Sequence, residues 1–355
     1  MHFKAKRVAA WAAVFASASL FGTGVANAKD DTVTLRFEHF LPANSNAQVN
    51  VIEPWCNDLK TESKGRIQCE IYPSMQLGGK PSQLNDQVRH GVVDIVWTAL
   101  GYSAGSFPRS EVLELPFMLP DNGQAASKII WDYATTYGKD DFTPYKVLAV
   151  YSDVGGTLHT TKKDVKTVDD LKGLRIRAST RLASRFLESV GATPVSMPPS
   201  QIADSLSKGV LDGALAAWEV VPPTKLDETT FYHTQTGPNQ AATTITTLAV
   251  LMNKQRYEGL PADLRAILDK YSGEALTMRF AAAWDKATAQ VVKTISANPK
   301  QHVNSWSADT YAALKAKSQP VVDEWLAAKV KNVDKQALYD GLEKLVKEQA
   351  PALVH

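Results

Sequence analysis

The feature that most constrains the fold is an internal repeat. Residues 81–100 read PSQLNDQVRHGVVDIVWTAL and residues 199–218 read PSQIADSLSKGVLDGALAAW, with eight identical residues in twenty positions. Average residue frequencies would give about one identity by chance. Each copy has the pattern of a helix that begins at Pro-Ser and ends at Gly, followed by a strand. We therefore expect two lobes of similar α/β architecture, unless two common helix-to-strand sequences coincide here by chance.

The sequence before the first copy continues this α/β pattern. Residues 32–41 and 65–73 have the composition of strands, and residues 47–63 between them have the pattern of a helix, which gives a βαβ unit. No linker-like segment appears in the chain, so we expect strands that cross between the lobes to join them, and not a tether.

Helical patterns dominate the last hundred residues. Residues 262–297 would form one helix of about 54 Å if it were unbroken, because each residue adds about 1.5 Å. Either this helix breaks at Ser272–Gly273 or it runs along both lobes as a spine. Two further helices are expected near 307–330 and 334–348.

The first 28 residues are typical of a secretory signal peptide. Lys4, Lys6 and Arg7 precede an apolar run that ends at the small-x-small site 26–28. Cleavage after Ala28 predicts an exported protein of the periplasm. It also lowers Lys+Arg from 39 to 36 against 37 Asp+Glu, which changes the net charge from +2 to −1. This balance argues against nucleic-acid binding, and no later apolar run reaches the roughly 20 residues of a membrane-spanning helix.

The chain contains two cysteines, Cys56 and Cys69. An exported protein folds in an oxidising compartment, so we expect a disulfide between them, worth about 3 kcal/mol for a loop of this length. Two unpaired buried thiols are the alternative. Neither state is catalytic, because the sequence has no Cys-x-x-Cys motif and no Cys/His cluster.

A strand expected within DLKGLRIRAS (170–179) carries two arginines. Arg175 and Arg177 alternate with Leu174 and Ile176, so the two guanidinium groups share one face. Ligands in open α/β sheets bind beyond the carboxyl ends of the strands, where Arg177 stands. Its planar fork could hold a ligand carboxylate or pair with an acid of the chain. Arg175 lies deeper, and we expect it to pair only with a neighbouring acid.

Two tryptophans come at the ends of the repeat units. Trp97 and Trp218 could face one another across a cleft and line a pocket, or pack in the core. Glu219 follows Trp218 directly. We interpret Glu219 as a charge at a helix N-terminus in preference to a pocket acid.

One motif is typical of an enzyme. GYSAG (101–105) matches G-x-S-x-G after an expected strand, the setting of a nucleophilic serine. Pro108 and Pro116 follow, however, and disfavour the helix that such a site requires. A periplasmic serine hydrolase using Ser103 is therefore a remote alternative. The seven histidines are scattered and no phosphate-binding glycine motif is present, so we expect no metal ion and no cofactor.

Seven segments, taken in order, resemble the periplasmic solute receptors of tripartite ATP-independent (TRAP) transporters, the dicarboxylate and sialic-acid receptor family. Each segment alone is weak, but their order and spacing are specific and cover nearly the whole chain after residue 28. They are QLGG (76–79), GVVDIVW (91–97), LELPF (113–117), DLKGLRIR (170–177), GATPVSMPPSQ (191–201), GVLDGALAAWE (209–219) and LMNKQRYEGLPADLR (251–265).

This resemblance implies an α/β, two-lobed fold like that of periplasmic binding proteins, with mixed sheets flanked by helices and a long helix spanning both lobes. It implies no catalysis, and the family's arginine that grips the ligand carboxylate falls on Arg177. The expected parts are a signal peptide at 1–28, lobe I at 29–154 with a return segment at about 248–285, lobe II at 155–247 with about 286–306, and C-terminal helices at 307–355.

Several positions depart from the polar residues of the sialic-acid receptors in this family. By ungapped matching they are Phe40, Ala99, Tyr102 and Ala216, and a second arginine of those receptors becomes Leu158 or its neighbour His159. One carboxylate clamp among such side chains, with Trp218 beside them, suits an acid with an apolar or aromatic body. Buried polar groups of a ligand would lack partners there, at about 1–3 kcal/mol each. Sugar acids and dicarboxylates are therefore disfavoured.

The sequence thus predicts a non-enzymatic receptor that closes by hinge motion on a small carboxylate and delivers it to the membrane subunits of a TRAP transporter. An aromatic monocarboxylate such as benzoate, phenylpyruvate or mandelate is the first choice. The alternatives are a short 2-oxo or 2-hydroxy acid, with or without a cation, or a C4-dicarboxylate. A receptor that feeds a sensor kinase instead of a transporter also fits the sequence.

Overall fold

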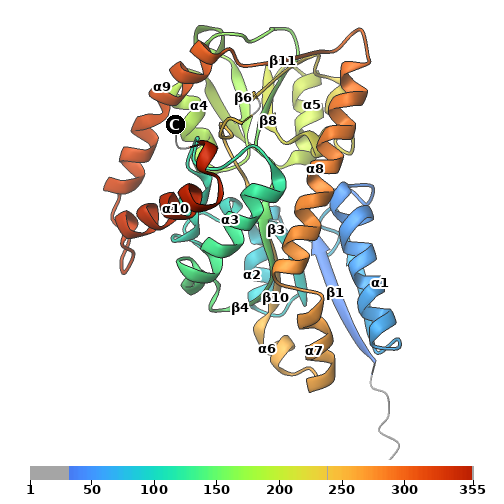
Figure 1. The fold of residues 1–355 in the computed structure, drawn as a ribbon. Coiled ribbons are helices and arrows are strands. Elements are labelled where there is room, and N and C mark those ends of the chain that lie inside the picture. Colours follow the sequence, from blue (N-terminus) through green and yellow to red (C-terminus); the bar gives the residue numbers. More distant parts are fainter. Residues whose placement is uncertain (1–31, 238, 354–355) are drawn as a thin grey trace, which may run out of the picture. The chain divides into compact units, whose positions relative to one another are not determined.

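The computed structural model describes residues 32–237 and 239–353 (Figure 1). The chain divides into two units, Met1–Asp31 and Thr32–His355, and the fold described here is that of the second unit. The expected signal peptide at residues 1–28 lies outside the described residues. None of the helices in the described ranges combines the length and the apolar composition that crossing a bilayer requires.

Two mixed sheets form the centre of this unit. The strand order is β2-β1-β3-β10-β4 in the first sheet and β11-β9-β5-β8-β6-β7 in the second. The first sheet consists of β1 (Val33–His39), β2 (Ile67–Tyr72), β3 (Ile95–Ala99), β4 (Tyr145–Ser152) and β10 (Thr247–Asn253). The second consists of β5 (Thr157–Thr160), β6 (Arg175–Ala178), β7 (Thr193–Ser196), β8 (Gly213–Ala216), β9 (Tyr232–Gln235) and β11 (His302–Ser305).

Helices flank both sheets, which confirms the predicted two-lobed α/β architecture (Figure 1). The last two helices correspond to those expected after residue 306. The α-helices of the described residues are α1 (Glu53–Glu62), α2 (Leu84–Arg89), α3 (Gly123–Thr136), α4 (Arg181–Ser189), α5 (Ile202–Ser207), α6 (Lys254–Glu258), α7 (Ala262–Lys270), α8 (Glu274–Ser296), α9 (Ala308–Ala327) and α10 (Lys335–Gln349).

The chain crosses between the two sheets, as the absence of a linker predicts. It leaves the first sheet after β4 for β5, and it returns after β9 to place β10 antiparallel between β3 and β4. Each sheet therefore falls within the segments that we expect for one lobe. The exact lobe boundaries stay a prediction.

Both repeat units fold as a short helix followed by a strand. A 3₁₀ turn at Pro81–Gln83 leads into α2 and then β3, and a 3₁₀ turn at Pro199–Gln201 leads into α5 and then β8. The glycine that ends the helix has a positive φ in both copies, 72° at Gly91 and 68° at Gly209. A side chain would strain the backbone there, which explains why both copies have glycine.

The repeated aspartate explains why each unit stays fixed to its neighbouring strand. Asp94 Oδ2 accepts hydrogen bonds from the backbone N–H of Arg36 at 2.8 Å and from its Nε at 3.3 Å. Asp212 Oδ2 accepts the same pair of bonds from Arg175, at 2.9 and 3.0 Å. Arg36 lies on β1, which pairs with β3, and Arg175 lies on β6, which pairs with β8. The two copies therefore share a structural role and not only a sequence pattern.

The long helical pattern breaks at Ser272–Gly273, one of the two expected outcomes. Gly273 adopts a φ of 73°, in the left-handed region that glycine favours, between α7 and α8. The 23 residues of α8 still extend about 35 Å. This helix contacts β4 of the first sheet and β11 of the second, so it spans both lobes (Figure 1).

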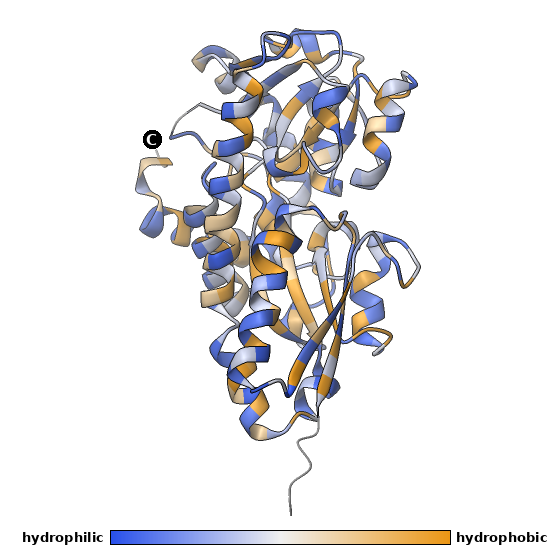
Figure 2. Ribbon diagram, turned by 90° about the vertical axis from the view of Figure 1, so that its right-hand side faces the viewer, coloured by the Kyte–Doolittle hydropathy of each residue, from blue (hydrophilic) through white to orange (hydrophobic). Residues whose placement is uncertain are grey.

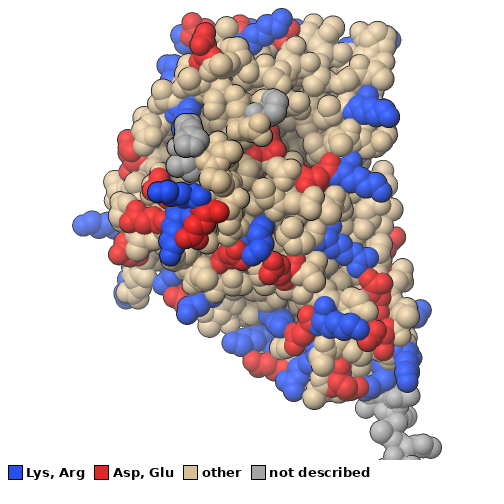
Figure 3. Space-filling model, in the orientation of Figure 1, with Lys and Arg blue, Asp and Glu red and all other residues tan. Residues whose placement is uncertain are grey.

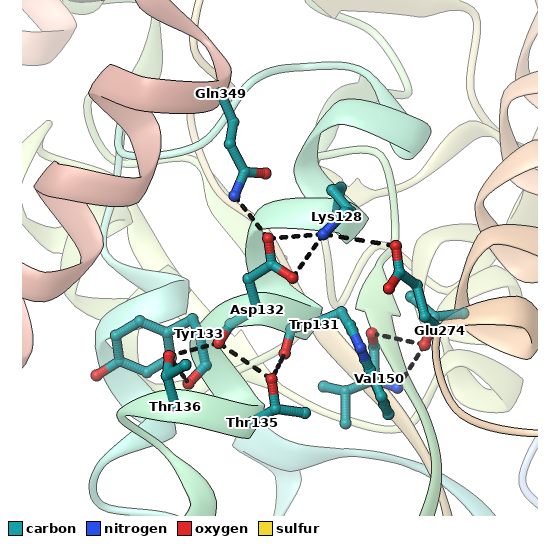
Figure 4. Close-up of polar contacts among 10 residues, drawn as sticks. Lys128, Trp131, Asp132, Tyr133, Thr135, Thr136, Val150, Glu274 and Gln349 are labelled. Atoms are coloured by element: carbon teal, nitrogen blue, oxygen red, sulfur yellow. Dashed lines mark hydrogen bonds and ion pairs between the residues drawn. The ribbon is translucent and has the colours of Figure 1, made fainter.

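A polar network holds the start of α8 against two other helices (Figure 4). Lys128 Nζ of α3 lies 2.6 Å from an Asp132 carboxylate oxygen and 3.4 Å from Glu274 Oε1, at the start of α8. Gln349 Nε2, at the end of α10, donates to Asp132 Oδ2 at 2.6 Å. The network ties α3, α8 and α10 together beside the first sheet.

Apolar residues concentrate on the strands and on the inward faces of the helices (Figure 2). Trp97, Tyr151, Phe280 and Trp284 are among the largest fully buried side chains, and all four belong to the core of the first sheet. On the face drawn in Figure 3, basic and acidic side chains are intermixed. This distribution fits the nearly balanced charge of the chain.

Cys56 of α1 and Cys69 of β2 form a disulfide, with a Cα–Cα distance of 5.8 Å. The bridge joins a helix to the edge strand of the first sheet. The expected pairing is therefore confirmed, and the alternative of two free thiols is wrong.

Candidate functional site

Arg177 is buried at the carboxyl end of β6, with only 3% of its surface exposed. Its Nε donates to the carbonyl oxygen of Met197 at 3.1 Å, and its Nη1 donates to that of Leu215 at 3.0 Å. Nη2 is also buried and has no well-formed hydrogen bond among the described residues, although the hydroxyl of Tyr102 lies beside the guanidinium. Because a buried N–H without an acceptor is costly, this guanidinium is suited to an acceptor that comes from outside the chain.

Arg175, two residues earlier on the same strand, is exposed and forms an ion pair. Its side chain is 44% exposed, and its Nε and Nη2 donate to the two carboxylate oxygens of Asp212 at 3.0 and 2.9 Å. The prediction that Arg175 pairs only with a neighbouring acid is confirmed.

Arg177 lines a cavity with an empty volume of about 510 Å³, counting the part that is open to solvent. The space within it that the centre of a water molecule can occupy is about 40 Å³, so the cavity is tight in this form of the structure. Phe40, Trp97 and Tyr102 reach the cavity from the first sheet and the turns that follow its strands, and Ala216 reaches it from β8 of the second. The structure therefore brings together five of the nine binding residues expected from the sequence.

Aromatic rings form one wall of this cavity. Phe40 and Trp97 stack with ring centroids 4.7 Å apart and an angle of 17° between the planes. The ring of Tyr102 meets Phe40 edge-on at 5.3 Å. Such stacked and edge-on contacts are the arrangements that aromatic groups prefer, and they leave flat apolar surface for a further ring.

Two crossing segments also contribute to the wall. Asp153, just after β4, lines the cavity and accepts hydrogen bonds at its Oδ1 from the backbone N–H groups of Gly155, at 3.0 Å, and Thr246, at 2.9 Å. Burial raises the pKa of Asp153, while these hydrogen bonds and the charge of Arg177 oppose the increase. The cavity thus lies where the chain passes between the sheets.

Glu219 is an acid of this wall, although its position in the sequence favoured a charge at a helix N-terminus over a pocket acid. It lies in the 3₁₀ turn Trp218–Val220, as a helix-end charge would, but it is only 5% exposed and lines the cavity. Burial, and next the charge of Asp153, raise the pKa of Glu219 well above its ordinary value. Its Oε2 has no hydrogen-bond partner among the described residues.

Four of the nine binding residues expected from the sequence do not line this cavity. Ala99 is buried opposite Leu248 in the register of β3 and β10, and Leu158 is buried among apolar side chains of the second sheet. The indole Nε1 of Trp218 donates to Gln235 Oε1 at 2.8 Å, and Trp218 lines a separate hollow with that residue.

His159 does not line the cavity, and its ring contacts the backbone of the wall residue Ala216. Its Nε2 lies 3.1 Å from the carbonyl oxygen of Ala216, and its Nδ1 lies 2.7 Å from His233 Nδ1. Trp218 packs edge-on against the His159 ring at 4.9 Å. These buried contacts support β8, the strand that carries Ala216.

Among the described residues, the surroundings of Ser103 do not resemble a hydrolase site. Its hydroxyl lies 2.8 Å from the carbonyl oxygen of Ser82 and 2.9 Å from Asn85 Oδ1, with turns in place of the helix that a nucleophile elbow requires. Within residues 32–237 and 239–353, no group of three or more His, Cys, Asp or Glu side chains could hold a metal ion.

Comparisons with known proteins show the family to which the chain is similar. Residues 37–329 match the family model described as bacterial extracellular solute-binding protein, family 7. A crystal structure of a TRAP solute binding protein from Rhodoferax ferrireducens T118, in complex with copurified benzoate, is 40% identical and has a TM-score of 0.86. The match covers 90% of this chain and 99% of that one.

Two further solved structures are similar. A marine metagenome TRAP solute binding protein, specific for aromatic acid ligands and bound to 3-hydroxybenzoate, is 38% identical, with a TM-score of 0.85 over 90% of this chain and 99% of that one. A TRAP periplasmic solute binding protein from Bordetella bronchiseptica with bound mandelate is 26% identical, with a TM-score of 0.80 over 89% and 99%.

Proposed function

Because the chain belongs to the bacterial extracellular solute-binding proteins of family 7, we propose that it is the receptor of a TRAP transporter for an aromatic monocarboxylate. It is a binding protein and not an enzyme, as are the family and the similar solved structures. Receptors of this kind bind a small carboxylate outside the cytoplasm and pass it to the membrane subunits of the transporter.

The observation that carries the proposal is the buried, unpartnered Nη2 of Arg177 in a cavity walled by aromatic rings. The other two nitrogens of the guanidinium are already fixed by backbone carbonyls, so the free N–H is held in a defined direction. A ligand carboxylate would complete this set with a charge-assisted hydrogen bond, which is roughly twice as strong as a neutral one.

The body of the ligand follows from the rest of the wall. Phe40, Trp97 and Tyr102 offer ring surfaces that an aromatic acid can cover. A second carboxylate on the ligand would instead lie near Asp153 and Glu219, where the described wall residues offer no second cation to pair with it. The similar structures that hold benzoate, 3-hydroxybenzoate and mandelate support the same ligand class.

The wall also supports a closing mechanism. Its side chains come from both sheets, and the chain crosses between the sheets at Asp153 and Thr246, where a hinge would lie. A ligand that contacts both sides stabilises the closed form over the open form by the difference between its two affinities. Closure would present the loaded receptor to the membrane subunits.

The family is extracytoplasmic, and we infer that this chain acts in the periplasm. We infer that export removes residues 1–28, with cleavage after Ala28, because a basic start, an apolar run and a small-x-small site follow in order. N-terminal sequencing of the exported protein should begin at Lys29, and a start elsewhere would move the boundary.

Thermal shift on residues 29–355 with a panel of acids tests the proposal. Benzoate or mandelate at 100 times its dissociation constant should add about 2.7 kcal/mol of stability, a rise of several degrees in Tm. Stabilisation only by C4-dicarboxylates, sugar acids or short 2-oxo acids would keep the receptor and reject the aromatic ligand. No response to any acid would overturn the receptor function itself.

A further inference from the structure

A second group of unpartnered polar atoms surrounds the cavity. Besides Arg177 Nη2 and Glu219 Oε2, the indole N–H groups of Trp97 and Trp284 and the hydroxyl of Tyr151 are buried without hydrogen-bond partners among the described residues. Such atoms are few in a well-folded protein, and each one calls for a water or a ligand group to satisfy it.

These atoms are gathered in one place. The ring of Trp284 lies edge-on to Trp97 at 6.0 Å and edge-on to Tyr151 at 5.2 Å. The Trp284 indole also lies close enough to Glu219 to favour its charged form. Burial raises the pKa of Tyr151, the charge of Glu219 adds to this increase, and the nearby Trp97 indole opposes it. We call Glu219, Trp97, Tyr151 and Trp284 the polar end of the cavity, of which Glu219 and Trp97 form part of the wall.

The elements that build the polar end are rigid. Trp97 lies on β3, Tyr151 on β4 and Trp284 on α8, and each of the three is among the largest fully buried side chains. The ring of Phe280 stacks on Tyr151 at 4.4 Å and fixes its position. The unpartnered atoms therefore cannot turn to bulk water, and only a group that enters the cavity can reach those on its wall.

The chemistry of the polar end selects among possible ligand groups. Two indole N–H groups can only donate a hydrogen bond, whereas the unpartnered Oε2 of Glu219 can accept one. A hydroxyl group on the ligand matches this set, because it accepts from an N–H and donates to the carboxyl oxygen. An ammonium group has no acceptor for the indoles, and a carboxylate would add a third acid beside Asp153 and Glu219.

We propose that Glu219 Oε2 receives the ring hydroxyl of a hydroxylated aromatic acid whose carboxylate binds Arg177. The inference rests on the proposed function, which it deepens by naming the second recognised group. Glu219 then determines specificity: it separates a hydroxybenzoate from benzoate, while Arg177 holds both.

Calorimetric titration of residues 29–355 with benzoate, 3-hydroxybenzoate and 4-hydroxybenzoate tests this role. The wild-type protein should bind at least one hydroxybenzoate ten times more tightly than benzoate. In Glu219→Leu this preference should vanish, so that benzoate and the hydroxybenzoates bind with similar Kd. Glu219→Gln, which still donates and accepts, should keep part of the preference.

Glu114→Gln is the matched control. Glu114 is also a buried acid, with a pKa raised to about 8 mainly by burial, but it does not line this cavity, and its Oε1 accepts from the backbone N–H of Thr247. The control should retain the full preference for the hydroxybenzoate.

The outcomes separate this inference from the proposed function. Equal binding of benzoate and both hydroxybenzoates by the wild-type protein would mean that water alone fills the polar end, and would overturn the inference. A preference that persists in Glu219→Leu would also overturn it. Absence of binding for all three acids would instead remove the proposed aromatic ligand.

Discussion

Replacing Arg177 by Met is expected to weaken the binding of benzoate or its hydroxylated relatives by about 2–5 kcal/mol, roughly 30-fold to several thousand-fold in Kd. The substitution removes the one buried cation of the cavity wall and leaves the ligand carboxylate without a charged partner. It keeps a side chain of similar length, so the space around the strand stays filled. Isothermal titration calorimetry measures the loss directly.

Two further variants make the Arg177 result interpretable. Arg175→Met removes a guanidinium two residues away on the same strand, but its side chain pairs with Asp212 at the surface, so binding should change by less than about twofold. Arg177→Lys keeps the charge but loses the fork that bonds to Met197 and Leu215, and should bind weakly. An unliganded Tm near that of the wild-type protein shows that each variant folds.

A result in which Arg177→Met binds as tightly as the wild-type protein would place the carboxylate elsewhere. The same conclusion would follow if Arg175→Met lost as much affinity as Arg177→Met, because the effect would then come from the strand and not from the cavity.

Removing the disulfide in Cys56→Ala/Cys69→Ala is expected to lower the free energy of unfolding by about 3 kcal/mol, since the bridge closes a short loop. For a chain of this size the corresponding drop in Tm is roughly 4 °C. The bridge joins α1 to the edge strand β2, and neither cysteine lines the ligand cavity. Ligand affinity at low temperature should therefore stay within about twofold.

A reducing agent separates the effect of the bridge from that of the substitutions. The wild-type protein in dithiothreitol should lose a similar amount of stability, while the double variant should not respond to the reagent. If the double variant unfolds early but the reduced wild-type protein does not, the loss comes from side-chain packing around Cys56, which is buried.

The fold was predictable because its strongest signals are local. The repeat at 81–100 and 199–218 specifies helix ends through proline and glycine and strand starts through an aspartate, and the same aspartate pins each unit to the next strand. The break at Gly273 was one of two open outcomes. Sequence alone could not choose between them, because a single glycine within a helical pattern can also be tolerated.

The site was predictable only in part. The position of Arg177 at a strand end left its role open, and the family resemblance assigned it to the ligand. Trp97 came from the repeat, and Phe40, Tyr102 and Ala216 came from the resemblance. Asp153, Thr244 and Thr246 were missed because they lie on crossing segments, whose path depends on contacts between distant parts of the chain.

Trp218, which follows β8, shows why a strand pattern in the sequence does not specify which side chain lines the cavity. The strand ends at Ala216, and the chain then turns through Trp218–Val220. In this turn Glu219 takes the place on the cavity wall, while Trp218 bonds to Gln235. A shift of one residue changes which side chain reaches the ligand, and the strand pattern in the sequence does not specify where the turn begins.

A crystal structure of residues 29–355 grown with benzoate tests the central claim most directly. The account predicts a carboxylate oxygen at about 2.8 Å from Arg177 Nη2, with the ring against Phe40, Trp97 and Tyr102. Benzoate bound at another place, with Arg177 Nη2 satisfied by the chain or by water alone, would contradict it.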